Sequence, residues 1–70
     1  MANTYTAITK QQGEWWIGWI EEVPGVNCQE ASLENLLEAL RITLKEMIQF
    51  NRDDAIRAAA PDFTEVPLTV

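Results

Sequence analysis

The run of residues 15–20 (WWIGWI) constrains this chain most, because it holds all three tryptophans of a 70-residue protein. Aromatic and β-branched residues favour strands, so the run predicts a strand from Trp15 to about Glu21. Side chains alternate between the two faces of a strand. One face therefore carries Trp15, Ile17 and Trp19, and the other carries Trp16, Gly18 and Ile20. Both faces need a cover, and a chain this short has few elements to supply one.

Two further strands are predicted around the tryptophan strand. Residues 4–9 are β-prone, and residues 10–14 form a polar, glycine-containing stretch typical of a hairpin loop of about three to five residues. Pro24 and Gly25 end the tryptophan strand, because proline lacks the amide donor and glycine tolerates a turn with positive φ. Residues 26–29 are long enough for a short third strand. Within the tryptophan strand, Gly18 indicates close approach by another backbone or ring.

An amphipathic helix follows, with Ser32 as its N-cap. Apolar residues recur at three- and four-residue spacing, at Leu33, Leu36, Leu37, Leu40, Leu44, Met47 and Ile48. They form one stripe, which can cover one face of a sheet. Ile42 falls opposite this stripe, either as an ordinary exposed residue or as part of an interface.

Two alternatives are open for the end of the helix. Residues 51–54 (NRDD) either interrupt it and start a second helix, or lie inside one helix that runs to Ala60. Pro61 ends either version. Residues 63–70 predict a last β-like segment, and Pro67 confines it to a sheet edge. The order β-β-β-α-β predicts an α+β fold in one domain, residues 1–70. Its small antiparallel-rich sheet has one face covered by the amphipathic helix.

The other face of this sheet has no cover within the chain. A chain of 70 residues buries only about 60–70% of the surface that its unfolded form exposes. Small domains compensate with disulfides, metals or oligomerisation. Cys28 is the only cysteine and histidine is absent, so a second polypeptide is the expected device. The partner is a second copy, in a dimer or higher oligomer, or another protein.

The charge balance limits the classes of partner that the chain is expected to bind. Eleven Asp and Glu against five Lys and Arg give a net charge of −6. Direct binding of nucleic acid wants clustered basic residues, so it is not expected. The charge favours a basic partner, although it also suits a plainly solvated surface. No apolar run approaches the ~20 residues of a membrane span, no signal peptide is visible, and a lone thiol fits the cytoplasm.

Catalysis is not expected, because the chain lacks the usual acid–base residue, histidine. Cys28 has no histidine to activate it and is expected to pack. The acidic side chains have no spacing diagnostic of a Mg²⁺ site, and no glycine-rich phosphate loop is present. No cofactor or metal is predicted. A metal-dependent nuclease relic that uses the acidic residues is the least favoured alternative.

The order of these motifs resembles the HicB family of antitoxins. The resemblance covers residues 4–48: Tyr5-Thr6-Ala7-Ile8, then Gly13-Glu14-Trp15-Trp16-Ile17-Gly18, then Glu22-Val23-Pro24-Gly25-Val26, then Ser32-Leu33-Glu34 opening the helix. The chain departs from the family pattern at Cys28, where glycine is frequent, and at residues 29–31, where a glycine-containing turn is usual. It also has only Arg52 and Arg57 as basic residues after residue 48, so the separate DNA-binding domain of many members is not expected here.

The resemblance implies a partial ribonuclease-H-like fold without nuclease activity. It also implies a function: binding a small basic RNA-cleaving toxin of the HicA type and covering its active site. The residues expected at the partner interface are Trp16, Gly18, Trp19, Ile20, Glu21 and Glu22. A solitary homo-oligomeric structural or regulatory protein with no toxin partner is the alternative.

Overall fold

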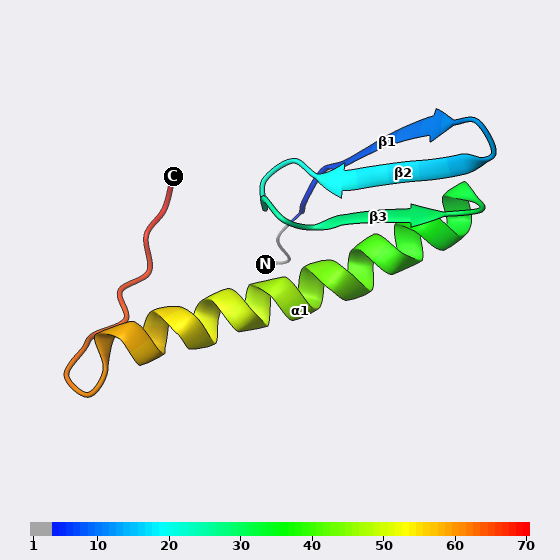
Figure 1. Ribbon diagram of the computed structural model, residues 1–70. Coiled ribbons are helices and arrows are strands. Elements are labelled where there is room, and N and C mark those ends of the chain that lie inside the picture. The colour runs from blue at the N-terminus through cyan, green and yellow to red at the C-terminus, as the bar shows by residue number, and fades with distance from the viewer. Residues whose placement is uncertain (1–3) are drawn as a thin grey trace.

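A computed structural model describes residues 4–70 of the chain. Three strands, β1 (Ala7–Gln12), β2 (Trp15–Ile20) and β3 (Asn27–Glu30), precede one helix, α1 (Leu33–Ala59). The strands form an antiparallel sheet in the order β1-β2-β3, and α1 lies across one of its faces (Figure 1). The predicted α+β fold, a small sheet with an amphipathic helix on one face, is confirmed.

The β1–β2 hairpin differs from its predicted form. Gln12 pairs with Trp15, so only Gly13 and Glu14 form the turn, and Gly13 has φ +62°. Glycine at the first central position suits the two-residue turns that match the twist of a hairpin. Strand β1 therefore begins three residues later than predicted and includes residues 10–12, which were predicted as loop. Pairing with the tryptophan strand draws these polar residues into the ladder.

The β2–β3 connection turns at Gly25, which has φ +95°. The Ile20 amide donates to the Val26 carbonyl at 3.1 Å, and the Val23 amide donates to the Ile20 carbonyl at 3.3 Å. These bonds close the turn and set Gly18 opposite Cys28 in the register. Strand β3 is thus confirmed, one residue later than predicted.

Helix α1 begins as predicted and continues without a break. The Ser32 hydroxyl accepts from the Asn35 amide at 3.1 Å, which satisfies one orphan donor of the first turn. Residues 51–54 lie inside the helix, so the single-helix alternative is correct. There the side-chain amide of Gln49 donates to the carboxylate of Asp53, four residues on, at 2.9 Å, and such pairs stabilise helices.

The core lies between α1 and β2. Ile20, Val26, Leu36 and Leu40 are buried, the two leucines almost completely. Gly18 makes this packing possible: a β-carbon there would lie 2.9 Å from the Ile8 carbonyl oxygen and 3.1 Å from a Leu36 methyl. The close approach predicted at Gly18 is therefore made by the backbone of β1 and, in place of a ring, by leucine side chains of α1.

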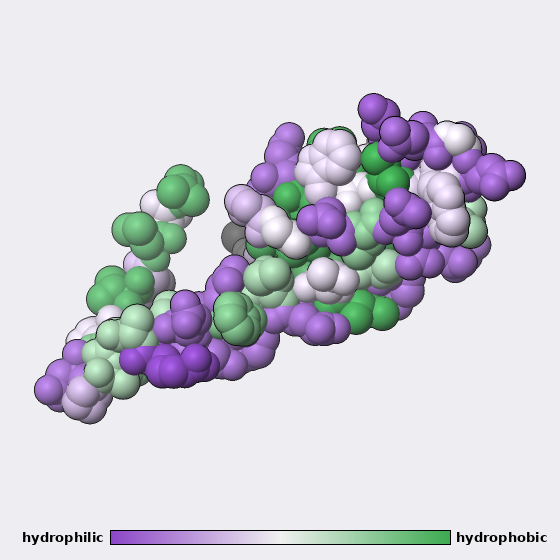
Figure 2. Space-filling view, viewed as in Figure 1, coloured by the Kyte–Doolittle hydropathy of each residue, from purple (hydrophilic) through white to green (hydrophobic). Residues whose placement is uncertain are grey.

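The predicted last strand, residues 63–70, is not formed in this structure, and every residue in it is exposed. The physical reason is the length of α1. Its 27 residues span about 40 Å, and its second half projects beyond the sheet (Figure 1). The segment therefore starts far from the sheet of its own chain. Figure 2 shows it as a largely hydrophobic strip that stands clear of the rest.

Candidate interaction surface

The sheet face that turns away from α1 is the main candidate site. We call it the open face, and it consists of Ile8, Lys10 and Gln12 on β1, Trp15, Ile17 and Trp19 on β2, and Asn27 and Gln29 on β3. The alternation of strand side chains defines it, because Gly18 and Ile20 point the other way, into the core. No element among residues 4–70 covers it.

The open face has an apolar middle and a polar rim. Trp15 and Trp19 are 49% and 42% exposed, with half-buried Ile8 and Ile17 beside them. Polar side chains from the two outer strands border them, which is how protein interfaces are commonly built. Exposed tryptophans on one side of a small sheet therefore indicate a binding surface.

The size of the open face limits what it can do alone. Three strands about 4.8 Å apart and about 20 Å long give a face of roughly 300 Å². A standard interface takes about 800 Å² from each partner. A stable complex must therefore use surface beyond the sheet, and the exposed acidic residues Glu14 and Glu21 flank the two ends of β2.

The interface residues predicted from the sequence separate into groups. Gly18 and Ile20 are buried beneath α1, and Trp16 is half-buried against the same core. Trp19 lies on the open face, and Glu21 is exposed next to it. The sequence-based set missed Trp15 and Ile17, which share the face of Trp19. The signal that would have found them is Gly18, because a missing side chain marks the face where the helix approaches.

Glu22 binds within its own chain. Its carboxylate accepts from the Thr6 amide at 2.8 Å and from the Thr6 hydroxyl at 2.7 Å, while the Glu21 amide donates to the Thr6 carbonyl at 2.9 Å. The hydrogen bond from the Thr6 amide, followed by that from its hydroxyl, lowers the pKa of Glu22. Glu22 therefore anchors the segment before β1 to the end of β2.

We expect this anchor to fail in acid. Because the pKa of Glu22 is lowered on folding, its contribution to stability is present above the ordinary value of 4.5 and disappears as the pH falls through the lowered value. The amide shift of Thr6, followed by NMR during acidification, should report this titration. In Glu22→Gln the titration should vanish, whereas in Glu21→Gln it should remain. Loss of the Thr6 titration in Glu21→Gln would contradict the prediction, because the titrating carboxylate would then be Glu21 and not Glu22.

The remaining charges leave the surface acidic. The arginines Arg41, Arg52 and Arg57 lie 2.7, 3.7 and 4.0 Å from the carboxylates of Glu38, Glu65 and Asp54. These exposed pairs add little stability. They do neutralise three of the five basic side chains of a chain with eleven acidic ones. The surface therefore carries the net negative charge of −6 with few unpaired basic side chains among the described residues.

Cys28 packs within the fold, and the carboxylates of the described residues do not gather into a metal-binding cluster. The Cys28 thiol is half-buried, packs against the core and lies 3.5 Å from the Thr43 hydroxyl. Within residues 4–70, no three acidic or cysteine side chains gather closely enough to hold a metal ion. In the same range, no helix combines the length and apolar character needed to cross a membrane.

Comparison of the chain with protein families, curated proteins and solved structures finds no match.

Proposed function

We propose that this chain is a non-enzymatic interaction module of the HicB antitoxin type. It binds a small basic RNA-cleaving protein of the HicA type and blocks access to its active site. The observation that carries the proposal is the open face, with Trp15 and Trp19 exposed at its centre. Aromatic residues of this kind supply most of the binding energy of protein interfaces.

The charge of the chain supports a basic partner. A net charge of −6 accelerates association with a basic protein and disfavours binding to RNA itself. Glu21 is exposed beside Trp19 and is the acidic residue best placed to meet a basic side chain at the edge of the open face. Such a complex masks the ribonuclease sterically, which requires no catalytic group in this chain.

The first four elements of the fold occur in the order that the resemblance implies, whereas the last strand of that βββαβ order is not formed among the described residues. The hairpin, the turn at Pro24 and Gly25, the short third strand and the Ser32-capped helix occur in the implied order. In this proposal the protein acts in the cytoplasm, where the lone thiol of Cys28 stays reduced.

The test is inhibition of RNA cleavage. If a neighbouring gene encodes a small basic protein, its purified product should cleave RNA, and adding this chain should stop cleavage at a stoichiometric ratio. Full cleavage in the presence of a large molar excess would reject the proposal. A heat-denatured sample of this chain controls for non-specific effects of an acidic polypeptide.

A further inference from the structure

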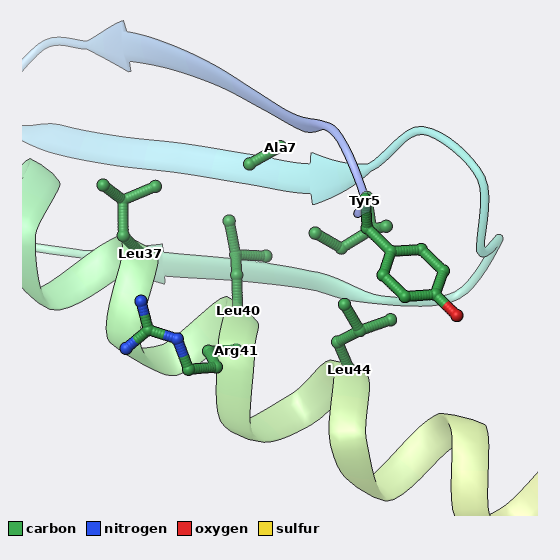
Figure 3. A pocket seen from close by; sticks show the side chains of 7 residues that line it. Tyr5, Ala7, Leu37, Leu40, Arg41 and Leu44 are labelled. Carbon is green, nitrogen blue, oxygen red and sulfur yellow. The ribbon is translucent and has the colours of Figure 1, made fainter. Parts of the chain in front are cut away.

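A second unpartnered surface lies between β1 and α1. This edge groove has a volume of about 250 Å³ and is lined mainly by Tyr5, Ala7, Leu37, Leu40, Arg41 and Leu44. In Figure 3 the three leucines rise from α1 toward the strands, and the Tyr5 ring lies beside Leu44. Strand β1 is an edge strand, so its outer backbone groups face this side without a strand to pair with. The groove is thus an apolar surface beside the outer edge of β1, where another strand could hydrogen-bond to the backbone.

Segment 63–70 has the complementary pattern. Val66, Leu68 and Val70 alternate along it, so an extended conformation puts them in one apolar row. Val66 and Leu68 are 75% and 89% exposed, and Val70 is fully exposed. Among the ion pairs of residues 4–70, one joins the segment to α1, the exposed Arg52–Glu65 pair at 3.7 Å, and such pairs are weak. Pro67 suits an edge strand, whose outer side needs no donor.

The segment as a whole cannot lie along the groove of its own chain, although its last residues can reach the near end of it. At 1.5 Å per residue, Leu44 lies roughly 24 Å from Ala60 along α1, and Leu37 lies roughly 35 Å away. An extended chain spans about 3.4 Å per residue, so Val66 stays within roughly 20 Å of Ala60 and Leu68 within roughly 27 Å. Leu68 reaches the near end of the groove only when fully stretched, and Val66 does not reach it.

We propose that residues 64–70 of a second copy of this chain bind the edge groove as a fourth strand beside β1. Each chain gives its segment to the other, which makes a two-fold symmetric dimer. The apolar row packs on Leu37 and Leu44, and the backbone extends the sheet. A strand of this length buries on the order of 1,000 Å² counting both surfaces, so the exchange of two reaches the ~2,000 Å² of stable interfaces. This inference is independent of the open face and of the proposed function.

Engineered cysteines test the exchange directly. In a Cys28→Ser background, chains carrying Leu37→Cys are mixed with chains carrying Leu68→Cys and oxidised. Both native side chains are exposed, at 40% and 89%, so the variants should fold. We expect a disulfide between the two chains, at twice the 8.0 kDa of one chain. In the matched control, chains carrying Ile42→Cys take the place of those carrying Leu37→Cys. Ile42 lies on the opposite side of α1, so little disulfide between residues 42 and 68 should form.

The double variant Leu37→Cys, Leu68→Cys separates exchange from folding back. Exchange gives a covalent dimer, whereas a disulfide within one chain would overturn the proposal. A second test measures the mass of the protein in solution by sedimentation, without cross-linking. Wild-type protein should sediment as two chains at micromolar concentration, Leu68→Asp as one, and Thr69→Asp, on the other face of the segment, as two. A one-chain mass for the wild type, or equal behaviour of the two Asp variants, would also overturn it.

Discussion

Replacing Leu36 with alanine is expected to lower the free energy of unfolding by about 3 kcal/mol. Leu36 has no exposed surface, and one of its methyl groups lies against Gly18 at the centre of the helix–sheet contact. The substitution leaves a cavity, because Gly18 has no side chain that could move to fill it. A domain of this size has a total stability of roughly 4–10 kcal/mol. The variant should therefore lose about 30% or more of its stability.

Urea unfolding followed by tryptophan fluorescence measures this effect, at one fixed protein concentration so that self-association does not enter the comparison. Ile42→Ala is the matched control, because Ile42 lies on the opposite side of α1 and is 50% exposed. Its loss should stay below about 0.5 kcal/mol. Similar losses for the two variants would mean that α1 does not pack through Leu36.

Local signals made much of this fold predictable. The stripe of leucines predicted α1, and the Ser32 hydroxyl predicted where the helix begins. Of that stripe, Leu36 and Leu40 are buried, whereas Leu33, Leu37 and Ile48 are exposed. These signals act within a few residues of the chain, where periodicity and capping are decided. The glycine in β2 likewise predicted a close approach, which Leu36 and Leu40 make.

Pairing between distant residues was the part that the sequence did not reveal. Residues 10–12 have the composition of a loop, yet each pairs with a residue of β2 and belongs to β1. The ladder decided their conformation, and their own propensity did not. Residues 51–54 likewise remain helical, although their composition suggested a break.

The location of the site depended on geometry in the same way. Strand propensity suggested that residues 63–70 form a strand, but propensity does not show how far a long helix carries them from the sheet. The alternation of β2 was visible in the sequence, and Gly18 was the one signal in it for the face that the helix covers. Only the packing of Leu36 and Leu40 on Gly18 assigns Trp16 to the helix side and leaves Trp15 and Trp19 on the open face.

Replacing both Trp15 and Trp19 with alanine should weaken binding of the proposed partner, a basic ribonuclease, about 100-fold or more. Aromatic anchors at the centre of an interface cost about 2 kcal/mol or more when truncated, and 2.8 kcal/mol corresponds to 100-fold in affinity. Both rings are already 40–50% exposed in the chain, so their removal should change stability much less than it changes affinity. Isothermal titration calorimetry with the purified ribonuclease measures the affinity, and a urea titration measures the stability.

Trp16→Ala is the matched control. Trp16 is next to Trp15 in sequence, but it lies on the helix side of β2 and packs against the core. It should lower the free energy of unfolding by about 2 kcal/mol and leave the affinity of the folded protein near that of the wild type. Opposite effects of neighbouring tryptophans can arise only if the two faces of β2 have different roles. Wild-type affinity in the Trp15, Trp19 double variant would exclude the open face as the binding surface. Weak binding by Trp16→Ala, measured where it is fully folded, would mean that the partner reaches the helix side of the sheet.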